Sequence, residues 1–312
     1  MVIKPIVVVG SINTDMVIRV DRIPKRGETI LGGDFVSAGG GKGANQALAA
    51  ARAGGQVTFV ARIGLDIFGH HALAALAKAG IGTDYIVRDQ LNPSGMAFIL
   101  VAPDGENSIA VAPGANAKLS PSDVKKASSV LHKAGMLIMQ LEIPIDTVVK
   151  SAEMAFQASV AVMLNPAPAR ELPHALLRLI SILTPNESEA EILTGIKIKH
   201  ESDALKAADA LIALGVQTVV ITMGAKGAFL AHGDERCLIP GFKVDTVDTT
   251  AAGDVFNGAL AVALTKSKCL REAVHFANAA AALSVMVLGA QASIPMRCSI
   301  DNLVRANTMF CR

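Results

Sequence analysis

Six short apolar runs along the chain predict buried strands, at residues 6–10, 57–64, 136–142, 160–166, 180–186 and 218–224. Most are continuous stretches of Val, Ile, Leu and Met, which is typical of parallel strands covered by helices on both faces. Ala- and Leu-rich stretches with helical spacing lie between many of them, such as residues 44–54, 71–80 and 202–215. This alternation predicts an α/β fold with a doubly wound, mostly parallel sheet sandwiched by helices.

Two further segments, residues 16–36 and 94–112, instead alternate polar and apolar positions and contain proline and glycine turn signals. We expect them to form antiparallel strands with one exposed face. They would make a small β-sheet that projects from the core as a lid, a dimer face or both. Residues 1–312 are then expected to form a single domain, with the lid strands within residues 11–37 and 94–115.

The composition limits the possible partners of the protein. Of the 312 residues, 51% are hydrophobic and 18% are charged, which is enough apolar material for a large core. A net charge of +2 without runs of like charge argues against nucleic acid as a partner. The four cysteines form no C-x-x-C pair, so neither a zinc site nor a redox dithiol is indicated.

A membrane location is not indicated either. The Ala-rich stretch at residues 273–288 contains His275 and Asn278, so it predicts a core helix and not a membrane span. The N-terminus has no signal-peptide pattern, because its apolar run is too short. We therefore expect a cytoplasmic protein.

Polar side chains follow several predicted strands at their carboxyl ends, the edge at which open α/β sheets bind ligands. The residues are Asn13, Asp15, Glu142, Asn186, Glu187 and Glu189, with the glycine-containing stretch MGAKG after the last strand. A ligand site along this edge is therefore predicted.

The stretch GGGKGANQ at residues 39–46 is a glycine-rich loop that leads into a helix. It is not a phosphate-binding loop of the Walker A type, because Gly43 stands where Ser or Thr is required. It is not a dinucleotide fingerprint, because Gln46 stands where the third glycine is required. It can bring a ligand close to the backbone, or it can be a flexible connection.

The stretch DTTAAGDVFNGAL at residues 248–260 precedes and enters a second predicted helix, expected from Val255. Small residues at Ala251, Ala252 and Gly253 would leave the first N–H groups of that helix open to an anion. Asp254 would then be the catalytic group beside the anion, or simply the N-cap of the helix, a common position for Asp.

These two stretches, in this order, resemble the two signatures of the ribokinase-like (pfkB) carbohydrate kinases. The resemblance extends over nearly the whole chain, through GSINTD, LNPAPARELP and TPNESEAEILTG. It implies that Asp254 is the general base and that Ala251, Ala252 and Gly253 form an anion hole for the transferred phosphoryl group.

The reaction implied by the resemblance is ATP-dependent phosphorylation of the 5-hydroxyl of D-ribose. Deoxyribose, another sugar or a nucleoside remain alternative substrates, and a sugar-binding regulator without catalysis is a further alternative. ATP, Mg²⁺ and an activating K⁺ are the implied cofactors, and a homodimer through the lid is the implied assembly.

The sugar-binding residues implied by the resemblance, besides Asp254, are Asn13, Thr14, Asp15, Gly41, Lys42, Gly43, Ala44, Asn45 and Glu142. An amide at Asn13 favours a sugar that keeps its 2-hydroxyl, because a site built to hydrogen-bond a hydroxyl rejects the analogue that lacks it. Turn chemistry is the alternative for Asn13 and Asp15, and a solvated surface charge is the alternative for Lys42.

The ATP-binding residues implied by the resemblance are Asn186, Thr222, Met223, Gly224, Ala225, Lys226, Gly227, Gly253, Asp254 and Asn278. Glu189 is expected to bind Mg²⁺ through water, although it could simply be an acidic residue in the first turn of a helix. The implied K⁺ ligands, mostly backbone oxygens, are Asp248, Thr250, Ser284, Val287, Gly289 and Ser293.

Overall fold

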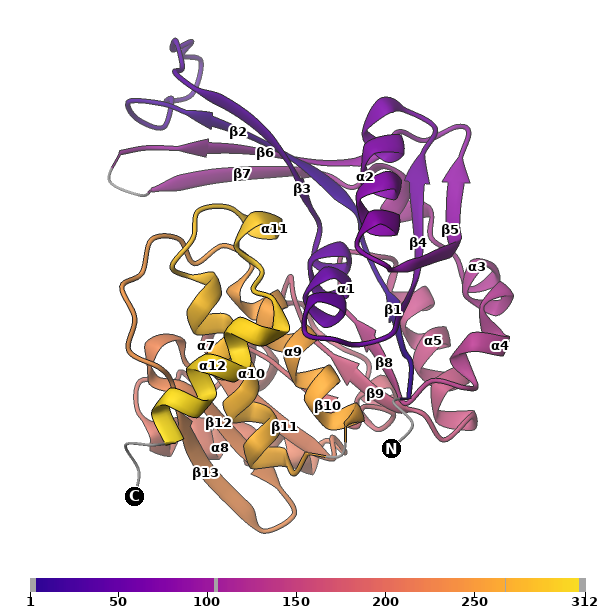
Figure 1. Cartoon of the computed structure of the whole chain (residues 1–312), viewed down its shortest axis with the longest axis vertical. Helices are drawn as coiled ribbons and strands as arrows, with labels where there is room; N and C mark the ends of the chain where they lie inside the picture. Colours follow the sequence, from indigo (N-terminus) through magenta and orange to yellow (C-terminus); the bar gives the residue numbers. More distant parts are fainter. Residues whose placement is uncertain (1–3, 104–105, 267, 309–312) are drawn as a thin grey trace.

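The computed structural model describes residues 4–103, 106–266 and 268–308. Its centre is a nine-stranded sheet in the order β13-β12-β11-β10-β9-β8-β1-β4-β5 (Figure 1). The strands from β11 to β5 in this order are parallel, and β12 runs antiparallel to both of its neighbours, β11 and β13. The bounds are β1 Ile6–Val9, β4 Val57–Gly64, β5 Gly82–Asp89, β8 Met136–Met139, β9 Ala161–Leu164, β10 Ile182–Leu183, β11 Thr218–Thr222, β12 Gly227–His232 and β13 Glu235–Pro240.

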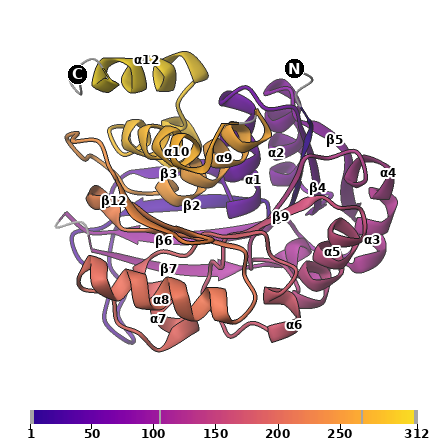
Figure 2. The ribbon, with the colours of Figure 1, turned by 90° about the horizontal axis from the view of Figure 1, so that it is seen from below.

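Helices cover both faces of this sheet, as Figure 2 shows from below. One layer contains α1 (Lys42–Arg52), α2 (Ile67–Lys78), α9 (Ala252–Thr265), α10 (Leu270–Ser284) and α12 (Arg297–Thr308). The other contains α3 (Pro121–Lys126), α4 (Ser128–Leu131), α5 (Ile145–Gln157), α6 (His174–Leu177), α7 (Glu187–Thr194) and α8 (Glu201–Ala213). The predicted doubly wound α/β fold is therefore confirmed.

Each buried strand contributes to two separate cores. On β1, Ile6 and Val8 pack among α1, α9 and α10, whereas Val7 and Val9 pack among the helices of the opposite layer. Side chains of a strand alternate between its faces, so a strand buried on both sides must be apolar at every position. This is why the buried strands appear in the sequence as continuous apolar runs.

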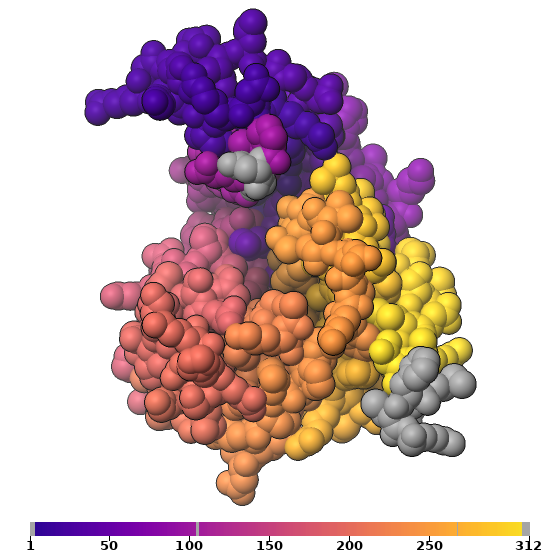
Figure 3. All heavy atoms as spheres, turned by 90° about the vertical axis from the view of Figure 1, so that its left-hand side faces the viewer, coloured from indigo at the N-terminus to yellow at the C-terminus, as the bar shows by residue number. Residues whose placement is uncertain are grey.

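A second sheet of four strands, here called the lid, projects from the body of the molecule (Figure 1). Its order is β3-β2-β6-β7, with β2 Asn13–Arg19, β3 Phe35–Gly40, β6 Gly95–Val101 and β7 Asn107–Ala112. Figure 3 shows the molecular surface hollowed beneath it, between the lid and the body.

The lid differs from the sequence prediction in two ways. The two segments form the expected antiparallel pairs, β2 with β3 and β6 with β7, but the central strands β2 and β6 pair in parallel, which was not predicted. Residues 20–34 contain no strand, and β3 runs to Gly40, beyond the expected limit at residue 37. The two central strands belong to different hairpins separated by the β4–α2–β5 unit, and an alternating pattern cannot reveal which hairpin edges meet.

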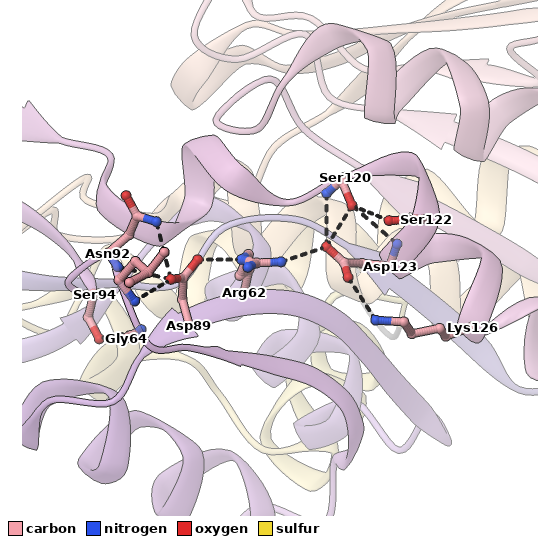
Figure 4. Close-up of polar contacts among 10 residues, drawn as sticks. Arg62, Gly64, Asp89, Asn92, Ser94, Ser120, Ser122, Asp123 and Lys126 are labelled. Carbon is pink, nitrogen blue, oxygen red and sulfur yellow. Dashed lines mark hydrogen bonds and ion pairs between the residues drawn. The ribbon is translucent and has the colours of Figure 1, made fainter.

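An ion network fastens the base of the lid hairpin β6–β7 to the main sheet (Figure 4). Arg62 on β4 contacts Asp89 at 2.6 Å, before the hairpin, and Asp123 at 3.0 Å, after it. Burial alone would raise the pKa of Asp89, but hydrogen bonds from Arg62 and from the N–H groups of Leu91 and Asn92 outweigh it and hold this pKa well below its usual range. The hairpin therefore leaves from and returns to one rigid point.

Candidate active site

The site begins where the strand order reverses, between β1 and β8. At this point the carboxyl ends of parallel strands open a crevice. The Ser11 hydroxyl donates to Glu142 Oε2 at 2.5 Å, and the backbone N–H of Lys42 donates to the same oxygen at 3.0 Å. Glu142 therefore joins the loop after β1, the turn after β8 and the start of α1.

The glycine-rich loop packs tightly on this loop after β1. A Cβ on Gly40 would lie 2.2 Å from the Asp15 carboxylate, one on Gly41 2.6 Å from Asn13 N, and one on Gly43 2.5 Å from Ser11 N. Gly41 also has a φ of 88°, which favours glycine. At these positions the missing side chains make room for the chain itself, so a merely flexible connection does not describe this loop.

Asp254 lies in the first turn of α9, but it is not the N-cap. The N-cap is Ala251, with a φ of 61°, and no side chain caps the helix. The Asp254 carboxylate instead accepts hydrogen bonds from Asn45 Nδ2 at 3.0 Å and from Gln46 Nε2 at 2.9 Å. The ordinary N-cap interpretation of Asp254 was therefore wrong, and the helix begins at Ala252, not at Val255.

A chain of amides that the sequence did not reveal holds Asp254 in place. Gln46 Nε2 also donates to Asn165 Oδ1 at 3.1 Å, and Gln46 Oε1 accepts from Gln140 Nε2 at 2.7 Å. Gln140 and Asn165 are polar residues at the ends of two apolar runs, which was the available signal. Asn45 keeps a buried Oδ1 atom without a partner among the described residues.

Five charged groups influence one another around this point. Burial, reinforced by Glu142 and Asp254, raises the pKa of Asp15 to about 6. Burial also raises the pKa of Asp254, against the opposing effects of Lys42, Gln46 and Asn45. Burial would lower the pKa of Lys42, but Asp254, Glu142 and Glu189 outweigh it and raise this pKa. Lys42 is half-buried in this cluster, so a solvated surface charge does not describe it.

The start of α9 offers open N–H groups. Gly253 N–H makes no hydrogen bond to any described residue, and a Cβ on Gly253 would meet nothing within 4 Å. Ala252 N–H, in contrast, donates to Thr249 O at 3.2 Å. Of the expected anion hole, Gly253 is therefore the most open to a ligand.

The side chain of Thr14 points away from that of Asp15. It lies between Asn13 and Asp15 on β2, so it faces the opposite side of the lid. It lines a pocket of about 480 Å³ together with Phe68 and His71, to which Asn13 and Ala44 also contribute. Thr14 could therefore contact a sugar beside Asp15 only through its own backbone atoms.

The expected nucleotide residues have structural partners of their own. Asn186 and Glu189 form a reciprocal capping box at the start of α7, with bonds of 2.8 and 2.9 Å. Asn278 Nδ2 donates to Ile239 O and Pro240 O. The loop after β11 turns through Gly224 at φ 55° and Gly227 at φ 105°.

Asp248 connects two loops beside the start of α9. Its Oδ1 accepts from the N–H and hydroxyl of Thr250, at 2.9 and 2.6 Å, and its Oδ2 accepts from Gly289 N at 2.8 Å. Burial would raise the pKa of Asp248, but these hydrogen bonds outweigh it and lower the pKa. The carbonyl oxygens of Thr250 and Val287 accept no hydrogen bond from the part of the chain that the structure describes.

The fold and this site define the class of the protein. The model of the pfkB family carbohydrate kinases matches residues 4–297, so the chain belongs to that family. A ribokinase of Haemophilus influenzae is 48% identical over 94% of this chain and 96% of its own length. A deoxyribokinase of Salmonella typhi is 38% identical over 93% of this chain and 95% of its own length.

A solved structure gives the same result. The ribokinase of Arabidopsis thaliana complexed with ribose and ATP superimposes with a TM-score of 0.91 and 36% identity, over 97% of this chain and 99% of that one. Among the described residues, no helix combines the length and apolar character needed to cross a membrane.

Proposed function

We propose that the protein is an ATP-dependent sugar kinase that transfers the γ-phosphate of ATP to the 5-hydroxyl of D-ribose. The products are D-ribose 5-phosphate and ADP. The observation that carries this proposal is the Asp254 carboxylate, only 6% exposed, held by two amides beside the open start of α9. The identity to ribokinases over nearly the full chain supports the same substrate.

In the reaction, Asp254 accepts the proton of the sugar's 5-hydroxyl as that oxygen bonds to the γ-phosphorus. The bond from the γ-phosphorus to the bridging oxygen breaks, and ADP leaves with its electron pair. Phosphoryl transfer depends on positioning and charge stabilisation, which the N–H groups at Gly253 and the positive end of the α9 dipole supply. The raised pKa of Asp254 suits a base that must hold a proton.

The sugar is held by Asn13, Asp15, Lys42 and Asn45 in this proposal. The unpartnered Oδ1 of Asn45 is a buried acceptor available to a hydroxyl donor, since a buried polar atom without a partner is costly. Asp15 accepts from further hydroxyls. Glu142 contributes through the oxygen that Ser11 and the Lys42 N–H leave free.

The nucleotide lies across the loop at residues 222–227 and the start of α9, with Asn186 and Asn278 beside it. Mg²⁺ supplies charge neutralisation on the phosphates, and Glu189 holds it through water. Burial raises the pKa of Glu189, against the Asn186 N–H and Lys42, and the charge of Asp254 also raises it, which supports a position of Glu189 near these groups.

A monovalent cation, K⁺, is held beside the anion hole by backbone oxygens. The free carbonyl oxygens of Thr250 and Val287 fit a weakly hydrated cation, and Asp248 fixes both loops that bear them. Ser284, Gly289 and Ser293 complete the proposed set. The cation supplies positive charge next to the developing charge of the transferred phosphoryl group.

The test is ADP release from ATP and Mg²⁺ with D-ribose or 2-deoxy-D-ribose, each with and without K⁺. We expect strong turnover with ribose, weak turnover with deoxyribose, and stimulation by K⁺. Turnover mainly with 2-deoxy-D-ribose would show that deoxyribose, and not ribose, is the substrate. No turnover with either pentose would leave another sugar, a nucleoside or a binding function without catalysis.

Replacing Asp254 by Asn tests the base directly. The amide cannot accept the proton, so kcat should fall about 10²- to 10⁴-fold, while binding of ribose, measured by calorimetry, changes much less. The Asp234→Asn variant, in the exposed turn between β12 and β13, is the control and should keep full activity. Turnover that survives Asp254→Asn would refute the catalytic assignment.

A homodimer through the lid is also proposed, in the cytoplasm, where ATP is supplied. The large apolar side chains of Phe35 and Phe98 lie on the same face of the lid and are 59% and 50% exposed. Exposed apolar patches of this kind mark protein contacts. Light scattering at micromolar concentration should give the mass of two chains, and Phe98→Glu should give one. A wild-type monomer would contradict the proposed dimer.

A further inference from the structure

A buried asparagine outside the proposed reaction site contacts one of its residues. Asn116 lies on the 3-10 helix η1 (Gly114–Lys118), where the lid hairpin returns to the body, and it is only 1% exposed. Its Nδ2 donates to Ile12 O at 3.0 Å and to Asn13 Oδ1 at 2.8 Å. Its Oδ1 accepts from Ile12 N at 2.9 Å.

These contacts fix which way the amide of Asn116 points. The backbone of Ile12 presents one donor and one acceptor to it, and only one orientation of a side-chain amide satisfies both. If the amide were flipped, its Nδ2 group would face the N–H of Ile12 and its Oδ1 would face the carbonyl oxygen of Ile12. The group that reaches Asn13 is therefore always the Nδ2 donor.

The orientation of Asn13 follows from that of Asn116. Facing a donor, Asn13 must offer its Oδ1, and its own Nδ2 is directed elsewhere. Asn13 Nδ2 makes no hydrogen bond with the residues that the structure describes. Asn13 shares a face of β2 with Asp15, so this free N–H group is a donor on the face of the strand that bears the Asp15 carboxylate.

The segment that bears Asn116 is rigid. Ala115 N donates to Pro93 O at 2.7 Å, which joins the two ends of the lid hairpin. Ser120 and Asp123 form a capping box at the start of α3, and Asp123 contacts Arg62 (Figure 4). The position of Asn116 is therefore set by the main sheet, not by the lid alone.

Gly95 makes room for the pair. A Cβ on Gly95 would lie 2.2 Å from Asn116 Nδ2 and 2.3 Å from Asn13 Oδ1. Both clashes involve the ends of side chains, so an added methyl group would displace the amides more readily than the backbone.

We propose that Asn116 is a positioning residue for substrate specificity, because it forces Asn13 to present an N–H donor to the sugar. A vicinal diol can donate its hydroxyl hydrogens to Asp15 and receive this N–H on a hydroxyl oxygen. A sugar without that hydroxyl leaves the donor unpaired, which a buried site penalises. This inference rests on the proposed phosphorylation of ribose.

The substitution Asn116→Asp tests it, because a carboxylate cannot donate to Asn13 Oδ1. Asn13 should then turn its Nδ2 toward the new carboxylate and its Oδ1 toward the sugar. We expect the KM for ribose to rise about 10- to 100-fold, with kcat at saturating ribose and the KM for ATP changed less than about threefold. The preference for ribose over 2-deoxyribose should shrink by at least about tenfold. Asn107→Asp, the same change on exposed strand β7, is the control.

A double-mutant comparison separates positioning from general damage. In an Asn13→Ala background, Asn116→Asp should change the ribose KM less than about twofold, because the residue through which it acts is gone. Equal effects in both backgrounds, or an unchanged preference in the single variant, would overturn the proposal. If Asn116→Asp does not fold, Gly95→Ala offers a second test. Its added methyl group displaces the amides of Asn13 and Asn116, so it must also reduce the preference for ribose over 2-deoxyribose. Wild-type protein without ribose turnover would instead refute the proposed function itself.

Discussion

The carboxylate of Asp15 should limit sugar binding in acid. Its pKa is raised to about 6, and it must be ionised to accept hydrogen bonds from sugar hydroxyls. Asp254 must also be ionised, so the acid limb of a pH profile belongs to both groups together. We expect kcat/KM for ribose to fall below pH about 6, by up to about tenfold per pH unit for each of the two groups that becomes protonated.

The Asp15→Asn variant separates the two groups. It should have a lower kcat/KM at every pH, and its acid limb should move to lower pH, because the titration of Asp15, whose pKa is raised to about 6, is removed. Steady-state rates with ribose from about pH 5 to about pH 8 measure this. An acid limb unchanged by Asp15→Asn would exclude Asp15 as its source.

At the same scale, the sequence marks the proposed reacting groups but not the groups that orient them. Asp254 and Asn45 stand in recognisable stretches, and the structure brings them into contact. Gln46 and Asn116 act on residues 208 and 103 positions away, so no local pattern marks them. A long-range hydrogen bond becomes visible only when the fold has placed both partners.

At the scale of helices and strands, the site depends on the close contact between α1 and α9. A Cβ on Gly258 would lie 2.6 Å from Ala49 Cβ and 2.7 Å from both Ala50 N and Gln46 O. Gly258 lies one helical turn after Asp254, on the same face of α9. Close packing at Gly258 therefore brings Asp254 within reach of Asn45 and Gln46.

The Gly258→Ala variant should push α9 away from α1. Alanine favours a helix by about 1 kcal/mol over glycine, but overpacking against backbone atoms costs about 1–3 kcal/mol, so unfolding should become easier. More specifically, kcat should fall at least tenfold, because the amides no longer hold the base. Urea unfolding and steady-state kinetics measure the two effects. Full stability with full kcat would show that the close contact has no such role.

The sequence predicted those strands that are buried on both faces, because such strands need apolar residues at every position. All six apolar runs contain strands of the main sheet. The edge strand β5 was missed, because Asp84 and Arg88 interrupt its apolar pattern where one side of the strand faces solvent. The hairpin β12–β13 was missed as well. The parallel pairing of β2 with β6 was also missed, because the pattern of a single strand does not encode which strand lies next to it.

Across the whole molecule, Arg62 holds the lid base to the sheet by neutralising two buried carboxylates. Arg62→Met removes the guanidinium shared by Asp89 and Asp123, whose side chains are 2% and 3% exposed, and leaves Asp123 only its ion pair with Lys126. We expect a loss of about 2–3 kcal/mol at pH about 7, at the lower end for a broken buried pair because Arg62 is partly exposed.

The loss should depend on pH. The folded-state pKa values of Asp89 and Asp123 are lowered, so their contribution is present above about pH 4 and disappears as pH falls through the folded pKa. The difference between wild type and Arg62→Met in urea unfolding should therefore narrow in acid. Arg22→Met, which removes an exposed ion pair with Glu28, is the control and should change little. A difference that is constant with pH would contradict the role of the two carboxylates.

The packing of Gly40, Gly41 and Gly43 against the chain limits the routes by which sugar preference can evolve. Any side chain at these positions would displace strand β2, which bears Asn13 and Asp15, or the loop just before it, so substitutions there would destroy the pocket instead of reshaping it. Libraries randomised at the three glycines should return almost only inactive clones. Libraries at Asn13 and its partner Asn116 should return active enzymes with altered preference, which makes this pair the accessible path to a new sugar.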